Sequence, residues 1–527
     1  MKGILVLAGI ALLLVAPIVM RPHPPAAAHA ERLVIISPHG ESTRFEFGRA
    51  FGVWAQRELD TTVDIDWRTP GGTRDIQRLL EDRYKTFFSE AHPEFTGDVL
   101  SAFADPKIDA ADSTASADKK AARAAFLASD TATDMDLWWG GGEFPHREFA
   151  QKGITVDAGL LQQEPGWFTD EVIPRTLSGE TIYDPKGRYY GTCLSTFGIC
   201  SSPDRLALLS PSDIPRAWSD LGDARFFGQV TMVDPTRSAA IVSALERLIQ
   251  QHMAAAVGDG KGDPETLSRG WSDAFVLIKR IAGNARALSD GASKAVRDVV
   301  RGDATVAMCI DFHARAEAAY SIAQTAGTSR ISFVAPIGGT SISADPISLL
   351  RGAPHRKLAV AFIRFALSPE GQRLWSYRIG EPGGPQKYEL YRMPVRKDVY
   401  TGTDRAHMSD AGMDPFTVAA SFTYHAGWTA PLYGLIGPLT KAVILDPREE
   451  LIAAWRAILD AGGPEAVPEA WREFCWMPIT YGEAKSTLAE ISKDSAAMLP
   501  ITRRWTVEAT AHYRAARRLA ATMSGAR

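Results

Sequence analysis

Short loops of glycine, hydroxyl and charged residues interrupt the sequence where predicted strands lead into predicted helices. In two of them, Gly71-Gly72-Thr73 and Thr236-Arg237-Ser238, small or hydroxyl residues stand at the start of a helix. Unpaired backbone N–H groups and the helix dipole favour a negative charge at such a position. Arg237 would add a bidentate, charge-assisted contact to the same anion. These loops therefore predict a site for a phosphate or a carboxylate.

The same residues also fit ordinary structural roles. The threonines and the serine of these loops are typical helix-capping residues, and Arg237 is equally typical of a protein surface. The run Gly140-Gly141-Gly142 would let the backbone approach a ligand closely or would simply form a turn. Trp138 and Trp139 alternate faces if they lie on a strand, so one is expected in the core and the other is free to stack on a ligand.

No motif in the sequence predicts catalysis. It contains no H-E-x-x-H, G-x-S-x-G or G-x-x-x-x-G-K-[ST] pattern and no paired C-x-x-C runs. The run Asp311-Phe312-His313 would place a base near an acid, but no nucleophile accompanies it, and a solvated loop is the simpler interpretation. We therefore expect a binding protein without a cofactor, and not an enzyme.

The elements that position these loops follow from hydrophobic periodicity. Residues 31 to about 84 have the pattern of strand, helix, strand, helix, which is a βαβ opening. Thr43 and Glu46 predict a capping box at the start of the first helix. The loop 37–41 would then lie between the carboxyl end of a strand and a helix N-terminus, the edge where parallel α/β sheets bind ligands.

Composition limits the class of protein. The chain has 527 residues, of which 45% are hydrophobic and 23% charged, enough for two or three globular domains. A net charge of −4 without long blocks of one sign argues against nucleic acid as a partner.

The first thirty residues predict export. Lys2 precedes an apolar run from Gly3 to Met20, and Ala28-His29-Ala30 before Glu31 is typical of a signal-peptide cleavage site. A retained membrane anchor is the alternative, because the run is close to the length that spans a bilayer. Four cysteines are too few for a disulfide scaffold; a Cys193–Cys200 bridge and four buried thiols are both compatible with the sequence.

Changes in pattern along the chain suggest five regions. We expect a leader at 1–30, a first α/β block at 31–144 with a solvated helical insertion at about 104–133, a second block at 145–335, a return to the first block at 336–400, and a helical C-terminal extension at 401–527. Apolar positions from Leu439 to Trp455 predict that this extension packs across the back of a lobe.

Several short segments keep a characteristic order and spacing over residues 31–400. They are Ser37-Pro38-His39-Gly40-Glu41, Trp67 with Gly71-Gly72-Thr73, Trp138-Trp139-Gly140-Gly141, 215–221, 234–238, Asp345-Pro346-Ile347, 365–372 and 391–395. Together they resemble the extracellular solute-binding proteins of the ferric-iron, polyamine and phosphosugar branch of ABC importers. The resemblance implies the α/β periplasmic-binding-protein type II fold, with two lobes joined by crossing strands that close on a ligand.

The resemblance also implies a site and partners. It brings four loops together at the cleft and implies a periplasmic monomer that delivers a small molecule to an ABC permease in the inner membrane. A sensory subunit that presents its ligand to a membrane receptor is the alternative. The expected ligand contacts are His39, Gly40, Glu41, Gly71, Gly72, Thr73, Trp139, Gly140, Gly141, Thr236, Arg237, Ser238, Asp311 and Phe312.

The family's iron-binding members show which donors a ferric ion needs. They use a histidine on the first loop, a glutamate near the glycine run and a tyrosine pair after the strand predicted at 305–310. Here His39 matches, Glu143 is only nearby, and Asp311-Phe312 replaces the pair, a poor donor set for a hard trivalent ion. A polyamine would need carboxylates and aromatic faces at the cleft, which Glu41, Asp311, Phe312 and a tryptophan could supply. We expect a phosphorylated or otherwise anionic solute, with iron and polyamines as alternatives.

Overall fold

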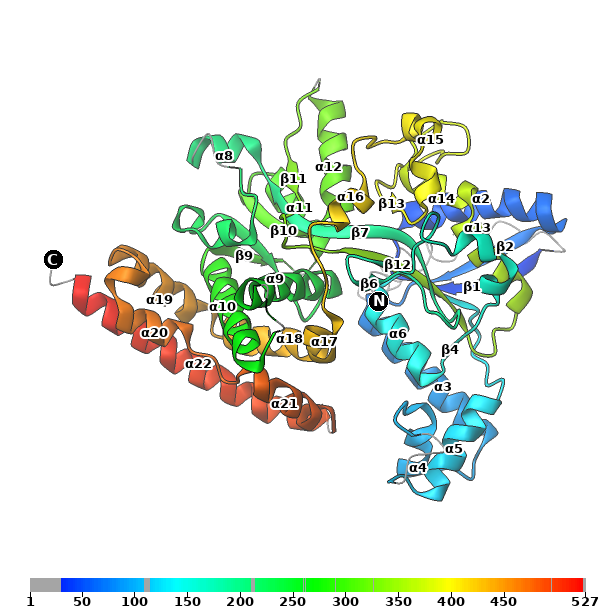
Figure 1. Cartoon of the computed structure of the whole chain (residues 1–527), viewed down its shortest axis with the longest axis horizontal. Coiled ribbons are helices and arrows are strands. Elements are labelled where there is room, and N and C mark those ends of the chain that lie inside the picture. Colours follow the sequence, from blue (N-terminus) through cyan, green and yellow to red (C-terminus); the bar gives the residue numbers. More distant parts are fainter. Residues whose placement is uncertain are drawn as a thin grey trace, which may run out of the picture.

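A computed structural model describes residues 30–108, 114–209, 214–258, 260, 262–289, 291–325, 327–493 and 495–524. Within these ranges the chain forms two α/β lobes and a helical C-terminal layer (Figure 1). The predicted leader at 1–30 lies outside the described residues except for Ala30. Among the helices of the described ranges, none has both the length and the apolar character that crossing a membrane requires.

Lobe 1 begins with the predicted βαβ unit. Strands β1 (Glu31–Ile36) and β2 (Val63–Arg68) pair in parallel and are connected by helix α2 (Glu41–Leu59). Strand β3 (Leu137–Trp139) pairs with the other edge of β1, and helix α3 (Thr73–Ala91) follows β2. The carboxyl ends of these parallel strands therefore meet at one edge of the sheet, as the sequence pattern predicted.

The predicted capping box of α2 is wrong. The helix begins at Glu41, with Gly40 as its N-cap and no side-chain cap. Glu46 instead lies buried and accepts hydrogen bonds from the backbone N–H groups of Gln386, Lys387 and Tyr388 at 2.6–2.9 Å. A contact with a segment some 340 residues away replaces the local one, because burying this carboxylate requires several donors.

Two long strands join the lobes. Strand β7 (Tyr190–Ser201) pairs with β12 (Ile342–Leu350) through residues 190–196 and with β10 (Val306–Ile310) through residues 197–201. Strand β12 continues into lobe 1, where it pairs with β3. The sheet order β2-β1-β3-β12-β7-β10-β8-β9 is therefore continuous, and β7 and β12 are the expected crossing strands (Figure 1).

Lobe 2 is a second α/β unit with its own apolar core. Its central strands β8, β9 and β10 pair in parallel, and β11 pairs with β7. Its elements are β8 (Val230–Val233), α9 (Ala239–Val257), α10 (Pro264–Gly283), β9 (Ala285–Ser289), α11 (Ala292–Val300), α12 (Asp311–Gln324) and β11 (Ser332–Val334). The crossing point on β7 lies at Thr196 and Phe197, where pairing changes from β12 to β10.

Residues 145–190 differ from the expected division of the chain. Phe149 and Ile154, from helix α6 (Glu143–Lys152) and the residues after it, pack in a lobe 1 core with Trp138, and Ile173 and Ile182 pack in the other lobe 1 core. Short strand β4 (Thr155–Val156) pairs with β12 on the same side. Lobe 2 therefore begins within β7 and not at residue 145, because the chain returns to lobe 1 before it crosses.

The insertion near 104–133 is helical, as expected, but it also has an apolar face. Helix α5 (Ala117–Ala128) buries Phe126, which packs with Phe103, Tyr84 and Phe88 in the second lobe 1 core. Arg123 of the same helix donates to the carbonyls of Phe103, Gln151 and Lys152. The insertion is thus attached to lobe 1; residues 109–113 of it lie outside the described ranges.

The C-terminal extension packs on lobe 2. Its apolar residues from Leu432 to Ala520 belong to the same core as α9 and α10, and Leu439, Val443, Ile444, Leu451 and Trp455 are buried as the sequence predicted. Helix α22 runs along the outer edge of this layer (Figure 1). The helices are α18 (Tyr433–Thr440), α19 (Arg448–Asp460), α20 (Pro468–Cys475), α21 (Tyr481–Lys493) and α22 (Ser495–Ser524).

The Cys193–Cys200 bridge does not form. Both residues lie on β7 and all four cysteines are free. A separation of seven residues along an extended strand places the two Cα atoms about 23 Å apart, far beyond the reach of a disulfide. The thiols of Cys193, Cys200 and Cys309 are buried, which is the other arrangement that the sequence allowed.

A buried lysine holds the extension to lobe 2. Lys279 of α10 is fully buried, and its Nζ donates hydrogen bonds to the carbonyls of Phe474 (3.0 Å) and Trp476 at the C-terminal end of α20. Burial lowers the pKa of Lys279 to about 7. The folded protein therefore holds this proton more weakly than the unfolded chain does, whose lysines titrate at about 10.4.

This difference predicts a pH dependence of stability. Between pH 7 and 10 the unfolded chain binds more protons at Lys279, so the free energy of unfolding should rise with pH by at most about 1.4 kcal/mol per unit from this group. Lys279→Met removes the titration. Chemical unfolding of both proteins at pH 7, 8 and 9 should show a steeper rise for the wild type; parallel pH profiles would mean that the two carbonyls keep the ammonium charged.

Candidate ligand-binding cleft

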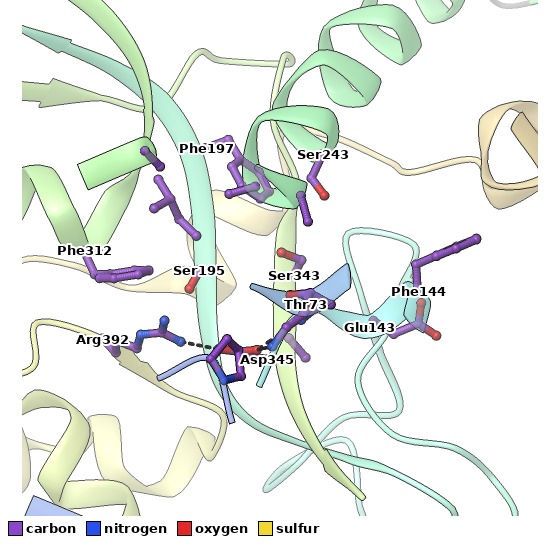
Figure 2. Close-up of a pocket in the computed structure, with 18 of the residues that line it drawn as sticks. Thr73, Glu143, Phe144, Ser195, Phe197, Ser243, Phe312, Ser343, Asp345 and Arg392 are labelled. Atoms are coloured by element: carbon purple, nitrogen blue, oxygen red, sulfur yellow. Dashed lines mark hydrogen bonds and ion pairs between the residues drawn. The ribbon is translucent and has the colours of Figure 1, made fainter. Parts of the chain in front are cut away.

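A cavity of about 440 Å³ lies between the lobes, and both lobes line it. Lobe 1 contributes the loops after β1 and β3, the start of α3 and Arg392; lobe 2 contributes Phe197, α9 and Phe312. Figure 2 shows Phe312 and Arg392 on one side of the crossing strands and Glu143 and Phe144 on the other. The hydroxyls of Ser195 and Ser343, from the crossing strands themselves, lie between them.

Helix N-termini converge on this cavity. Residues from the first turns of α2, α3, α6, α9, α11 and α12 all line it, with three of these helices in each lobe. No N-cap residue of these six helices has a side chain that accepts a hydrogen bond from the first turn; at α3 the carboxylate of Asp75 accepts one from the N-cap N–H of Gly72 at 2.9 Å. Because the N-terminal N–H groups of a helix have no intrahelical partner and carry a partial positive charge, the cleft is an environment that favours negative charge.

The carboxylate of Asp345 already takes part of that positive potential. It lies on β12, where Oδ1 accepts from the N–H groups of Gly141 (2.8 Å) and Gly142 (3.2 Å). Oδ2 contacts Arg392 Nη1 at 2.6 Å and His39 Nε2 at 3.1 Å. Burial alone would raise the pKa of Asp345, but the charge of Arg392 and the bonds from His39 and Arg392 hold it well below its ordinary value.

The glycine run makes this contact geometrically possible. Gly140 and Gly141 have φ of +90° and +109°, a region that favours glycine. A Cβ on Gly140 would lie 2.8 Å from the ring of His39, and one on Gly141 would lie 2.8 Å from the hydroxyl of Thr73. Below the run, His146 Nε2 contacts the carbonyl of Gly140 at 3.1 Å. The run therefore serves as a tightly packed turn that directs two N–H groups at Asp345.

Arg392 connects the lobes at the other end of the cavity. Its guanidinium lies over the ring of Phe312, 3.9 Å from the centroid, while it also pairs with Asp345 (Figure 2). Phe312 belongs to α12 of lobe 2, whereas Arg392 contacts Asp345 and the ring of Trp375 in lobe 1. A cation over an aromatic face at this distance is attractive, so the contact favours the arrangement in which the two lobes are close.

A second buried charge network lies on the opposite side. Arg247 of α9 donates to Glu180 Oε1 at 2.6 Å and to Glu246 Oε2 at 2.8 Å, and its Nε donates to Ser341 Oγ at 2.9 Å. Burial raises the pKa of Glu246, while Arg247 and two hydroxyl donors oppose that rise. Both carboxylates are thus occupied by partners inside the protein.

Glu143 is the remaining carboxylate of this wall. Its Oε1 accepts from the hydroxyl of Tyr189 at 2.6 Å, and Arg147 Nε lies 3.7 Å away. Burial is the main reason that the pKa of Glu143 is raised; Arg147 and Tyr189 lower it, and Glu180 adds to the rise. No group of three His, Cys, Asp or Glu residues within the described ranges is arranged to hold a metal ion, so His39, Glu143 and Asp311 do not form the iron set considered above.

The structure brings together part of the expected site. His39, Gly40, Thr73, Gly141, Glu143 and Phe312 line the cavity. Four other expected residues have their side chains elsewhere. Arg237 is exposed, and Thr236 donates a hydrogen bond to Asp234 Oδ1. Asp311 pairs with Arg315 beneath the surface, and Trp139 is buried and donates to Thr192. Glu41, Gly71, Gly72, Gly140 and Ser238 are also absent from the lining.

Neither tryptophan of the predicted strand is free to stack on a ligand. Trp138 and Trp139 do point to opposite faces of β3, but each face is covered, and they belong to the two separate cores of lobe 1. The strand is central in its sheet, with β1 on one side and β12 on the other. A residue on a central strand with helices over both faces has no access to the cleft.

Sequence reasoning missed the residues with the strongest electrostatic roles. Asp345 and Arg392 lie in two of the segments that carry the family resemblance, yet nothing local marks them as partners. Glu180, Arg247 and the aromatic residues Phe144, Phe197, Tyr424 and Tyr433 gave no signal at all. The available clue was that Asp345-Pro346 and Tyr391-Arg392 both stand in those segments.

Asp345→Asn should strongly destabilise the protein. The amide removes a charge that Arg392 requires, and breaking a buried pair of this kind typically costs about 3–5 kcal/mol. The matched control is Asp134→Asn, at an exposed carboxylate 3.7–3.9 Å from Arg68 and Arg83, which should cost about 1 kcal/mol or less. Urea unfolding followed by circular dichroism measures both; equal small losses would remove Asp345 from its central role.

Comparison with known proteins finds a family match for the middle of the chain. The sequence model of the bacterial extracellular solute-binding proteins matches residues 150–397, which include both crossing strands and all of the lobe 2 sheet. A protein of Haemophilus influenzae is 26% identical over 240 residues, covering 45% of this chain and 60% of its own length. The phosphoglycerate transport regulatory protein PgtC of Salmonella typhimurium is 23% identical over 217 residues, covering 41% and 45%. The chain thus spans about half the length of the curated relatives that it matches.

Solved structures of similar proteins cover more of the chain at lower identity. The periplasmic binding protein AfuA from Actinobacillus pleuropneumoniae, with fructose-6-phosphate bound, is 17% identical with a TM-score of 0.46, covering 80% of this chain and 97% of its own. Iron-bound HitA from Pseudomonas aeruginosa is 14% identical with a TM-score of 0.47, covering 77% and 98%.

The family match agrees with the topology. Two α/β lobes joined by β7 and β12 form the α/β fold of periplasmic binding proteins, and helices α18–α21 lie beyond the matched residues. This family consists of binding proteins and not of enzymes. By the match over residues 150–397, this part of the chain belongs to the bacterial extracellular solute-binding proteins, and the two-lobed fold with its cleft agrees with that family.

Proposed function

We propose that this protein captures a small anionic solute, in particular a phosphorylated one, and delivers it to the permease of an ABC importer. The observation that carries the proposal is the convergence of uncapped helix N-termini from both lobes on one cavity. An anion at that point would receive backbone N–H donors from several segments at once. We place the protein in the periplasm, as a monomer that meets an inner-membrane permease.

The carboxylates of the cleft support an anion and not a cation. Asp345 is held by Arg392 and His39, and Glu180 and Glu246 are held by Arg247. A polyamine or a ferric ion would have to break these pairs before it could use their oxygens, and leaving a buried arginine unpaired is costly. An anion leaves every one of them intact.

The name of one relative supports the same class of ligand and a second role. PgtC is named as a regulatory protein of phosphoglycerate transport. A phosphorylated, carboxylate-bearing solute fits a cleft that favours negative charge. The word "regulatory" also favours our second candidate function, in which the liganded protein is presented to a membrane sensor and the ligand chemistry stays the same.

Closure follows from where the donors lie. The start of α3 belongs to lobe 1 and the start of α9 to lobe 2, so only the closed arrangement gives one anion both sets of N–H groups. A ligand shifts the open–closed equilibrium by its difference in affinity for the two states, and a swing from 1:99 to 99:1 needs about 5.5 kcal/mol. Micromolar binding provides about 8 kcal/mol in total, so most contacts must form on closure.

A thermal-shift screen of the chain from Glu31 tests the ligand class. The panel contains phosphosugars, phosphonates, inorganic phosphate, polyamines, thiamine and ferric citrate, because a ligand that binds only the folded state raises the melting temperature. We expect stabilisation by phosphorylated compounds. Stabilisation only by polyamines or by ferric citrate would contradict the anion proposal.

Ala239→Pro tests the donor set directly. Ala239 is the first residue of α9 and lines the cavity, and the extended backbone of Ser238 before it suits a proline. The substitution removes one N–H group without removing a side chain that binds. Losing a hydrogen bond to a charged group, worth about 1.5–3 kcal/mol, should weaken binding roughly tenfold to a hundredfold, as measured by isothermal titration with the best compound of the screen.

Ala117→Pro is the matched control for that variant. Ala117 is the exposed first residue of α5, after the extended Ser116, and lies away from the cavity. It should leave affinity unchanged. If both variants bind as the wild type does, the N-terminus of α9 is not a donor to the ligand.

A further inference from the structure

We infer that the C-terminal extension completes the ligand cleft, with Tyr433 and Tyr424 as ligand-site residues and Tyr433 as the contact that closes the extension against lobe 1. The inference rests on the proposed binding role of the cleft. Tyr424, Ala426 and Tyr433 line the cavity, although the family match ends at residue 397. A segment outside the matched region therefore forms part of the cavity wall.

Tyr433 is fixed to the helix start that we propose as an anion donor. It is the first residue of α18, and its hydroxyl donates to the carbonyl of Ala239 and contacts Ser243 Oγ, both at 3.1 Å. Leu432, Leu435 and Ile436 beside it are buried in the core of lobe 2. The ring of Tyr433 therefore moves with lobe 2 and not independently of it.

The same ring reaches across the cavity to lobe 1. It stacks on Phe144 of α6, with ring centroids 4.6 Å apart and an interplanar angle of 26°. Phe144 follows Glu143 directly after the glycine run, at the wall opposite Phe312 (Figure 2). An aromatic pair of this kind exists only while the lobes are close, and its typical strength shifts an equilibrium by about two- to tenfold.

Tyr424 ties the extension to both lobes near the crossing strands. Its hydroxyl donates to Glu246 Oε1 at 2.7 Å, and its ring lies 5.1 Å from the guanidinium of Arg247 in lobe 2. Its backbone N–H donates to the carbonyl of Ser178 at 2.6 Å in a hairpin of lobe 1, and a Cβ on Gly179 would lie 2.3 Å from the carbonyl of Tyr424. The extension thus crosses the junction between the lobes instead of lying only on the back of one.

The chemistry of this wall complements the helix N-termini. Phe144, Phe197, Tyr424 and Tyr433 bring aromatic faces to the cavity, and the hydroxyls of Tyr424 and Tyr433 are already bonded within the protein. These side chains offer flat apolar surface and no free charge. They would contact the uncharged body of the solute while the N–H groups hold its anion, so the extension would select by shape.

The test measures the distance between the lobes in the full chain without ligand. Spin labels on Leu59→Cys of α2 and Leu208→Cys of helix α8 (Pro203–Leu209) report it, since both side chains are exposed on opposite lobes. Cys475 is replaced by serine because the other three cysteines are buried. Tyr433→Ala and Phe144→Ala should each shift the distance distribution toward longer values, and the double variant should shift it no further.

Matched variants separate closure from loss of folding. Tyr433→Phe keeps the ring and loses the two hydroxyl contacts, so it should retain the shorter distances; Tyr320→Ala removes an exposed tyrosine of lobe 2 and should change nothing. Unchanged distances in both alanine variants, with melting temperatures showing folded protein, would overturn the inference.

Affinity provides an independent measurement. For a compound that the thermal-shift screen identifies, Tyr433→Ala should weaken binding about two- to tenfold, and Tyr433→Phe should bind nearly as the wild type does. Normal binding by Tyr433→Ala together with unchanged distances counts against the inferred role of the extension and leaves the proposed function untouched. A screen in which no anion stabilises the protein counts against the proposed function and leaves the lobe distances to decide the inference.

Discussion

The carboxylate of Asp345, which is only 13% exposed, is the constraint around which the binding cleft is organised. A charge away from water is costly unless donors surround it, and Asp345 has four: two backbone N–H groups from the glycine run, Arg392 and His39. These donors come from three segments far apart in sequence. Because the carboxylate needs all of these donors, it holds together the loop after β1, the loop after β3 and the segment before strand β13 (Met393–Pro394).

The position of Asp345 on a crossing strand gives this contact wider consequences. Strand β12 pairs with β3 in lobe 1 and with β7, which continues into lobe 2. Arg392, held by Asp345, meets Phe312 of lobe 2, and Arg247 of lobe 2 meets Glu180 beside the crossing strands. The charges of Asp345 and Arg392 on one side of the cavity, and of Arg247 and Glu180 on the other, are thus paired within the protein.

The C-terminal layer shows how apolar burial and polar contacts divide their roles. Its helices add to the core of lobe 2 through many apolar side chains. A few polar contacts set its position: Lys279 of α10 donates to a carbonyl at the end of α20, and Tyr433 of α18 donates to the carbonyl of Ala239 at the start of α9. Apolar burial is large but non-directional, whereas hydrogen bonds at helix ends fix orientation. This combination places two tyrosines at the cavity from a segment that otherwise covers the back of the lobe.

The sequence by itself determined the alternation of strands and helices, the edge of the sheet at which loops gather, and the burial of the apolar face of the extension, because each depends on periodicity within one element. It also predicted an anion-favouring helix start at Thr73, which lines the cavity. Only the tertiary structure decided that Arg392 and not Arg237 serves the cleft, that Glu46 binds a remote backbone and not its own helix, and that residues 145–190 return to lobe 1. Those outcomes depend on which charges and strands become neighbours after folding, and partners 47 to more than 300 residues apart leave no local pattern to read.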